Sequence, residues 1–273
     1  MIKNKIAFCQ DLFKNKPLEE ICKLLLDLGY QGIELAPFCF SDDIRRLERT
    51  EILKYRKIIE DYGIQISGMH WLLVSPVGMS ITTLDNEIYN NTRDFFKKLI
   101  EFSYFIGNKI LIFGSPKQRN LLNKNNEQEL ARAITFFKEM SEMCSRYDIK
   151  IAFEPLGPQI TNFGGTTEDA LEIIKEVDHP SFSMMLDTCA ILREEKNPSD
   201  LIKSMKNKFI YYHLNDPNEF GPEMAALDFT PIFQAFSEIN YTGWVSVEPF
   251  STAISPEIIA KRSIENIKKI SIN

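Results

Sequence analysis

The feature that most constrains this sequence is a regular alternation of short apolar runs with longer amphipathic stretches along the whole chain. Eight of the apolar runs have the length and residue types of buried β-strands. They are residues 6–9, 32–36, 64–70, 109–113, 150–154, 181–187, 209–214 and 243–248. Strands that read as nearly continuous apolar runs are typical of a sheet covered on both faces.

A stretch with helical spacing of apolar residues follows each predicted strand. We expect helices over residues 18–28, 41–62, 84–106, about 126–147, 167–177, 199–206, 228–239 and 255–270. Gly29, Gly63 and Gly107 stand just past three of them, where a glycine commonly ends a helix. The polar segment 120–126 is expected to be an exposed loop.

Strands that alternate with helices predict a parallel sheet, because parallel neighbours need a crossover connection. The expected fold class is α/β, a single (β/α)₈ TIM barrel that spans residues 1–273 as one domain. A length of 273 residues suits such a barrel, which typically has about 250 residues. An open doubly wound sheet is the alternative, but no Gly-x-Gly-x-x-Gly follows the first strand.

The charge and cysteine content narrow the class of protein. A net charge of −6 argues against a nucleic-acid partner, which usually needs a basic patch. The five cysteines form no Cys-x-x-Cys pair, so we expect free thiols in a reducing compartment. No signal peptide and no membrane span is recognisable, and the expected location is the cytoplasm.

Polar side chains of metal-binding or acid–base type end six of the eight predicted strands. They are Glu34, His70, Glu154, Asp187, His213 and Glu248. In a barrel of this kind the active site lies at the carboxyl ends of the strands. A separate structural role for each side chain is the alternative interpretation.

The set from strands five to eight, Glu154, Asp187, His213 and Glu248, consists of three carboxylates and one imidazole. Carboxylates held at one point repel one another unless a cation neutralises them. This oxygen-rich set predicts one divalent metal ion, Mn²⁺, Mg²⁺, Co²⁺ or Zn²⁺.

Other residues near the strand ends are candidates for substrate binding. His70 and Trp71 follow the third strand, although a structural histidine is the alternative there. Lys117 and Arg119 follow the fourth strand and are either ligands of a phosphate or carboxylate group or solvated loop cations. Asp216 is an acidic neighbour of His213. Phe8 and Phe113 fill the core or line the pocket.

Four ordered motifs carry a family resemblance that covers essentially the whole chain. They are Phe153-Glu154-Pro155, Leu186-Asp187-Thr188, His213-Leu214-Asn215-Asp216 and Gly243-Trp244-Val245-Ser246-Val247-Glu248. With them the chain resembles the xylose isomerase-like barrels of the sugar phosphate isomerase/epimerase superfamily. That group includes ketose 3-epimerases, hydroxypyruvate isomerase, inosose dehydratase and, more distantly, endonuclease IV. The segment 114–119 looks like the signature of a subgroup.

The resemblance implies that Glu154, Asp187, His213 and Glu248 bind the metal and that Glu154 and Glu248 are the acid–base pair. The expected activity is isomerisation or epimerisation of a small sugar or sugar phosphate, by carboxylate proton transfer through a metal-stabilised enediolate. A homodimer is the family expectation. The epimerases have a histidine and an arginine where this chain has Ala190 and Glu219, so the resemblance does not fix the substrate.

Three alternatives remain open at this point. The same site would serve a dehydratase of the inosose type. An endonuclease IV-like repair enzyme needs more histidine ligands than the three histidines of this chain. A non-catalytic sugar-binding barrel would retain the fold without the chemistry.

Overall fold

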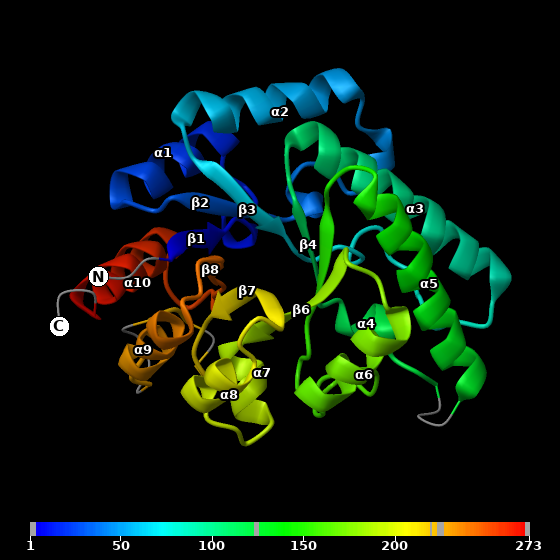
Figure 1. The fold of residues 1–273 in the computed structure, drawn as a ribbon. Helices are drawn as coiled ribbons and strands as arrows, with labels where there is room; N and C mark the ends of the chain where they lie inside the picture. Colours follow the sequence, from blue (N-terminus) through cyan, green and yellow to red (C-terminus); the bar gives the residue numbers. More distant parts are fainter. Residues whose placement is uncertain (1–3, 123–125, 219, 223–226, 271–273) are drawn as a thin grey trace. The chain divides into compact units, whose positions relative to one another are not determined.

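The computed structural model describes residues 4–122, 126–218, 220–222 and 227–270. Eight strands follow one another in sequence order in a closed barrel, and the strand pairs with a defined register are parallel (Figure 1). They are β1 (Lys5–Cys9), β2 (Gly32–Leu35), β3 (Gln65–Met69), β4 (Ile110–Phe113), β5 (Lys150–Phe153), β6 (Phe182–Asp187), β7 (Phe209–Leu214) and β8 (Trp244–Val247). The predicted (β/α)₈ fold is confirmed.

Helices alternate with these strands along the chain. They are α1 (Leu18–Leu28), α2 (Arg49–Tyr62), α3 (Asn86–Ile106), α4 (Pro116–Arg119), α5 (Glu127–Ser145), α6 (Thr167–Val177), α7 (Thr188–Arg193), α8 (Pro198–Ser204), α9 (Thr230–Ile239) and α10 (Pro256–Ile270). Short 3₁₀ turns are η1 (Asp11–Phe13), η2 (Pro37–Cys39) and η3 (Ile44–Arg46). Among the described residues, no helix has the length and apolar character that crossing a bilayer requires.

The helix ends follow from local chemistry. α1 ends at Gly29, whose φ of 95° is left-handed and therefore suits a residue without a side chain. Thr166 and Asp169 form a reciprocal capping box at the start of α6. Both helices have the predicted bounds.

The helix predicted over residues 41–62 is wrong in its first part. There the Asp43 side chain accepts a hydrogen bond from the Arg45 main-chain N–H and caps the 3₁₀ turn η3 instead. Leu47 then adopts an extended conformation, so the α-helix begins only at Arg49. Helices α4 and α7 are additional elements that the sequence analysis did not predict.

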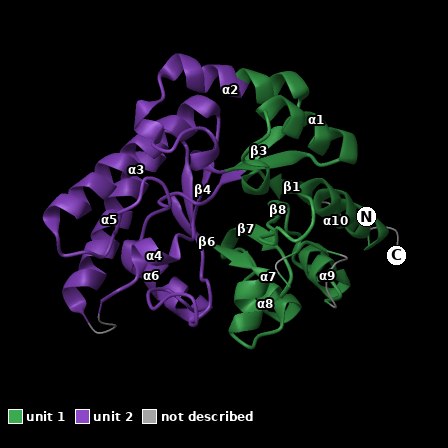
Figure 2. Ribbon diagram, turned by 180° about the vertical axis from the view of Figure 1, so that it is seen from behind, with its two compact units in different colours: residues 1–35, 57–67, 185–273 green, residues 36–56, 68–184 purple. Residues whose placement is uncertain are grey.

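The packing of the elements gives two compact units (Figure 2). The first contains residues 1–35, 57–67 and 185–273, and the second contains residues 36–56 and 68–184. The assignment of the whole chain to one domain stays a prediction.

In the first unit, the register of β1, β7 and β8 determines which residues at the carboxyl ends of these strands lie side by side. Phe8 and Leu214 both pair with Val247, and His213 pairs with Ser246. The next residues along these strands, Cys9, Glu248 and Asn215, therefore lie at the same level. Glu34 lies at this level too, because it pairs with Cys9. Phe8 is buried against Phe13 and Tyr30, so its core role is confirmed.

The core of the second unit is rich in phenylalanine. Phe113 lies 4.8 Å from Phe137 in an edge-to-face arrangement and stacks on Phe153 at 6.2 Å. Phe96, Phe136, Phe163 and Phe182 extend the cluster. Aromatic pairs of this kind stabilise a core beyond the burial of their area. Phe113 is therefore a core residue.

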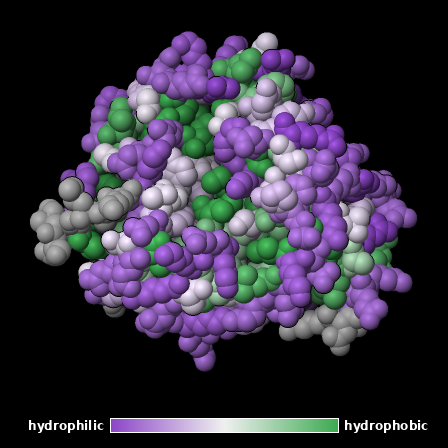
Figure 3. All heavy atoms as spheres, in the orientation of Figure 1, coloured by the Kyte–Doolittle hydropathy of each residue, from purple (hydrophilic) through white to green (hydrophobic). Residues whose placement is uncertain are grey.

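Figure 3 shows one face of the described residues. Hydrophilic residues cover most of it, and hydrophobic residues lie in separate small groups between them. The largest exposed fractions of apolar side chains among the described residues are 88% for Val77 and 94% for Leu122, both on loops. Single exposed apolar residues are normal in folded proteins.

Candidate functional site

Three of the predicted metal ligands lie together in the first unit. Asp187 ends β6, His213 lies in β7, and Glu248 directly follows β8. Each offers a ligand atom, and these atoms all lie within 4.8 Å of one another. All three side chains are buried, so the two carboxylates carry a large desolvation cost unless they are neutralised.

Glu34 and Tyr211 hold the His213 ring. His213 Nε2 lies 2.9 Å from Glu34 Oε1, and Tyr211 donates a 2.7 Å hydrogen bond to Glu34 Oε2. Burial and the Glu34 carboxylate raise the pKa of the Tyr211 hydroxyl, so it stays protonated and acts as a donor. The other ring nitrogen, Nδ1, lies 2.9 Å from Glu248 Oε2. The contact with Glu34 thus leaves Nδ1 of His213 facing the Glu248 carboxylate.

Asn215 orients two carboxylates at once. Its Nδ2 donates to Asp187 Oδ2 at 2.6 Å and lies 3.5 Å from Glu248 Oε2. The Cys189 main-chain N–H donates to Asn215 Oδ1 at 3.0 Å, which fixes the orientation of the amide. This role of Asn215 is not among the predictions from the sequence. The available signal was its place two residues after His213, on the same side of the strand.

Asp187 also starts a helix. Its Oδ1 accepts a hydrogen bond of 2.6 Å from the main-chain N–H of Ala190, in the first turn of α7. One carboxylate therefore serves as both strand end and helix cap.

Cys9 is a further ligand-type residue in the first unit. It ends β1, is completely buried, and its Sγ lies 3.6 Å from Ser246 Oγ. Burial raises the pKa of the Cys9 thiol, and the carboxylates of Glu34 and Glu248 raise it further. From the sequence alone, Cys9 is predicted only to be one of five free thiols.

In the second unit, Glu154 directly follows β5 and is 5% exposed. Its main-chain N–H donates to the Phe113 carbonyl at 3.1 Å, and its own carbonyl accepts a 2.7 Å hydrogen bond from Arg119 Nη1. Gly114 leaves the space that the Glu154 carboxylate occupies, because a Cβ there would collide with Oε2. Both ends of the segment 114–119 therefore lie against Glu154.

Arg119 is fully buried, with its guanidinium 4.8 Å from the centre of the Phe153 ring. Burial lowers the pKa of the guanidinium to about 9, and the Glu154 carboxylate acts in the opposite direction. The interpretation of Arg119 as a solvated loop cation is therefore wrong. Lys117, on the same short helix α4, is exposed. Substrate binding by Lys117 and Arg119 stays a prediction.

His70 and Trp71 follow β3 in the same unit. His70 is 2% exposed, and its ring centre lies 6.1 Å from that of Trp71. Trp71 has a φ of 53°, a left-handed conformation that is rare for a bulky residue. Such conformations concentrate at functional sites. Contact of both residues with the substrate stays a prediction.

Asp216 shapes the loop after β7. Its Oδ1 accepts hydrogen bonds from the main-chain N–H groups of Asn218 at 2.7 Å and Phe220 at 3.2 Å. Burial raises the pKa of the Asp216 carboxyl. These contacts show a role in the turn, and the predicted substrate contact stays a prediction. Glu219 lies outside the described residues.

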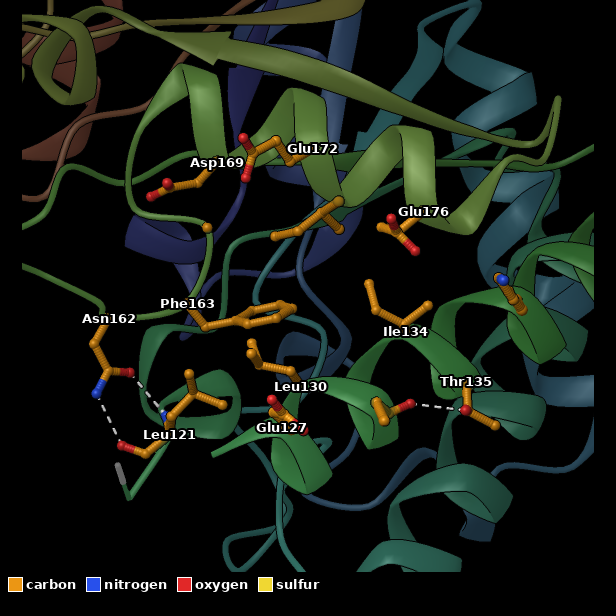
Figure 4. A pocket seen from close by; sticks show the side chains of 14 residues that line it. Leu121, Glu127, Leu130, Ile134, Thr135, Asn162, Phe163, Asp169, Glu172 and Glu176 are labelled. Carbon is orange, nitrogen blue, oxygen red and sulfur yellow. Dashed lines mark hydrogen bonds between the residues drawn. The ribbon is translucent and has the colours of Figure 1, made fainter. Parts of the chain in front are cut away.

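The second unit also contains a groove of about 820 Å³ between α5 and α6 (Figure 4). Leu130 and Ile134 line it from α5, and Asp169, Glu172 and Glu176 line it from α6. Among its described lining residues is none of the predicted site residues. The location of the predicted chemistry at the strand ends stays a prediction.

Comparison with known proteins agrees with this architecture. The profile of the xylose isomerase-like TIM barrel family matches residues 22–270. D-psicose 3-epimerase from Enterocloster bolteae is 23% identical over 226 residues, which cover 82% of this chain and 73% of that protein. Inosose isomerase from Bacillus subtilis is 25% identical over 201 residues, which cover 69% of this chain and 70% of that protein.

Among solved structures, D-allulose 3-epimerase from Methylomonas sp. in complex with D-allulose has the same fold. The TM-score is 0.81 at 17% sequence identity, over 97% of this chain and 96% of that one. Together with the closed parallel barrel, the profile match over residues 22–270 shows that this chain belongs to the xylose isomerase-like TIM barrel family.

Proposed function

We propose that this chain is a carbohydrate isomerase or epimerase that depends on one divalent metal ion. The observation that carries the proposal is the group of ligand atoms from Asp187, His213 and Glu248 within 4.8 Å of one another. The relatives support the same class, since one is a D-psicose 3-epimerase and another an inosose isomerase.

The residues fit a hard or borderline divalent cation. Two buried carboxylates and an imidazole nitrogen supply charge and donor atoms for Mn²⁺, Mg²⁺, Co²⁺ or Zn²⁺. Glu154 is the proposed fourth ligand, since it follows β5, the strand before the one that Asp187 ends. Mn²⁺ is the ion we would test first.

When bound, the metal would act as a Lewis acid that makes the hydrogen next to a sugar carbonyl more acidic. The protein side chains perform the remaining steps. We propose that Glu248 and Glu154 remove and return the proton on carbon. Asn215 holds the Glu248 carboxylate, and the Glu34 contact keeps the His213 ring in place. Return of the proton to the opposite face of the same carbon gives epimerisation, and return to the neighbouring carbon gives isomerisation.

The proposed substrate is a small ketose or aldose, free or phosphorylated, that differs in its contacts from the substrates of the ketose epimerases. Ala190 stands where those enzymes have a histidine, and it is buried in the first turn of α7. It offers no side-chain hydrogen bond to a sugar hydroxyl. Lys117, which is exposed, is the cation proposed for an anionic group, whereas the buried Arg119 is proposed to position Glu154. A cytoplasmic location and a homodimer stay predictions.

The test is a turnover screen of ketoses, aldoses, their phosphates and inososes with metal-free protein and added Mn²⁺. We expect conversion of at least one sugar with Mn²⁺ and none without a divalent ion. Asp187→Ala should lose both Mn²⁺ binding and turnover, whereas Asp200→Ala, which removes an exposed carboxylate of the same unit, should lose neither. Tight sugar binding without turnover in any metal form would instead identify a non-catalytic barrel. Loss of water from an inosose would identify a dehydratase.

A further inference from the structure

Cys9 stands beside the proposed ligands but does not belong to them. Phe8 pairs with Val247, so the next residues along these parallel strands, Cys9 and Glu248, come to the same level. Ala7 pairs with Ser246, and Ser246 pairs with His213. Side chains two residues apart point to the same side of a strand, so Cys9 and Glu248 point to the same side as His213. The register thus places a thiol next to a carboxylate and an imidazole.

The ligand atoms of Cys9, His213 and Glu248 all lie within 4.8 Å of one another. Thiolate, imidazole and carboxylate ligands on a tetrahedral zinc ion lie roughly 3.5 Å apart, given metal–ligand bonds of about 2.0–2.3 Å. The three ligand atoms therefore need to move only slightly toward one another to share one ion. Three protein ligands plus one water or substrate is the composition of many zinc sites in enzymes.

His213 and Glu248 thus belong to two ligand sets of different chemical character. With Asp187 they form a set of oxygen and nitrogen atoms, which suits Mn²⁺ and Mg²⁺. With Cys9 they form a set that contains sulfur, which suits thiophilic ions. Because both sets use the same two side chains, occupation of one position excludes the other.

We propose that Cys9, His213 and Glu248 form an alternative metal position that binds thiophilic divalent ions such as Cd²⁺ in preference to Mn²⁺. Binding replaces the S–H bond of Cys9 by a sulfur–metal bond and releases the proton to solvent. An ion in this position withdraws His213 and Glu248 from the set with Asp187. Thiophilic ions therefore inhibit the Mn²⁺ enzyme in competition with Mn²⁺, a regulation of the site that rests on the proposed function.

The test uses metal-free protein and the ions alone. Co²⁺ and Cd²⁺ bound to a thiolate give sulfur-to-metal charge-transfer absorption in the ultraviolet, which no oxygen or nitrogen ligand produces. We expect this absorption in the wild type, saturating at one ion per chain. Cys9→Ser should lose it and should weaken Cd²⁺ binding by more than the roughly 10–100-fold that loss of an outer-shell partner costs. Mn²⁺ affinity, measured by electron paramagnetic resonance, should be unchanged in Cys9→Ser.

Two further variants separate the two positions. Asp187→Ala should retain the Cd²⁺ absorption and lose Mn²⁺ binding, the reverse of Cys9→Ser. Cys22→Ser removes another buried thiol of the same unit and should behave as the wild type. Mn²⁺ binding by a wild type that shows no thiolate absorption with either ion would overturn this inference and leave the proposed function intact. Thiolate-bound Cd²⁺ in a protein that does not bind Mn²⁺ would support this position and overturn the proposed Mn²⁺ site.

Discussion

Arg119 Nη1 donates a 2.7 Å hydrogen bond to the main-chain carbonyl of Glu154, the residue that we propose as ligand and acid–base group. The same nitrogen lies 3.4 Å from the Phe113 carbonyl, so the guanidinium joins the ends of two neighbouring strands. The arginine is completely buried. Its contacts therefore indicate a role in placing Glu154.

Replacement of Arg119 by methionine distinguishes this role from substrate binding. We expect kcat to fall to the same extent for a neutral sugar and for its phosphate, with KM little changed, because the lost contact holds Glu154. Loss of about 1.5–3 kcal/mol of binding for the phosphate alone would instead show a charge-assisted contact with the substrate. Lys138→Met removes an exposed cation of α5 and serves as the control. Steady-state kinetics on matched substrates gives the answer.

Gly114→Ala should displace the Glu154 carboxylate and leave the fold intact. The added Cβ collides with Oε2, the end of a flexible side chain that can rotate away. A misplacement of about 1 Å at a reacting group costs up to about 10²-fold in rate, and we expect a loss of that order. Thermal unfolding should change little.

Gly63→Ala is the opposite control, since nothing lies within 4 Å of its added Cβ but its φ of 70° strains an alanine. That variant should lose roughly 1 kcal/mol of stability and retain its turnover. Unchanged turnover in Gly114→Ala would remove Glu154 from the reaction.

The division of labour between Glu154 and Glu248 is tested by Gln variants at each position. Glutamine keeps the size and one oxygen but removes the proton-accepting charge. We expect each variant to lose about 10²–10⁴-fold in turnover, with metal binding only weakened. In deuterated water the wild type should incorporate deuterium at the reacting carbon, as seen by NMR. Full activity of either variant would exclude this pair, and turnover without deuterium would indicate a shielded transfer or a hydride shift.

The raised pKa of the Asp216 carboxyl predicts how the free energy of unfolding changes with pH. Burial raises the pKa of its carboxyl in the folded protein, although the N–H groups of Asn218 and Phe220 act in the opposite direction. The folded protein therefore holds this proton more tightly than the unfolded chain, whose aspartates titrate near about 4. The protonated carboxyl therefore stabilises the folded protein. This stabilisation is fully present below the unfolded pKa and is lost as pH rises through the folded pKa. Asp216→Asn should thus gain stability relative to the wild type over this rise.

Asp228 gives the opposite sign, because the hydrogen bonds from Thr230 lower the pKa of its carboxyl. Its contribution is present above the unfolded value and is lost as pH falls, so Asp228→Asn should lose stability relative to the wild type as pH rises. Urea unfolding midpoints from acid to neutral pH measure both differences. Parallel curves for Asp216→Asn and the wild type would contradict the assigned direction.

Much of the fold follows from local sequence patterns. The strand Phe209–Leu214 and the helices Leu18–Leu28 and Thr167–Val177 have their predicted bounds, because apolar spacing and end signals agree there. Helix α7 escaped prediction because it starts at Thr188 with no loop after β6, and Asp187 serves both elements. Helix α4 escaped because Ser115 enters it with a left-handed φ of 36°, which no local pattern announces.

The site could be predicted only as far as strand ends define it. Asp187, His213 and Glu248 were predicted from their place at the ends of consecutive strands, and their ligand atoms do lie together. The roles of Cys9, Asn215 and Tyr211 depend on register and side-chain contacts between distant parts of the chain. A one-residue change in register would turn each of these side chains to the other face. Sequence periodicity does not fix that register.

The hydrogen bond between Asp187 Oδ1 and the Ala190 N–H has an evolutionary consequence. Residue 190 is 1% exposed and lies in a helical turn that starts on a proposed metal ligand. An imidazole at this position needs more room than a methyl group, and the turn cannot shift without moving Asp187. A histidine at position 190 is therefore expected to need an adjustment of this turn, so a single substitution from alanine should cost stability. Divergence of substrate choice in such a chain is expected to proceed through loop residues, while residue 190 stays small.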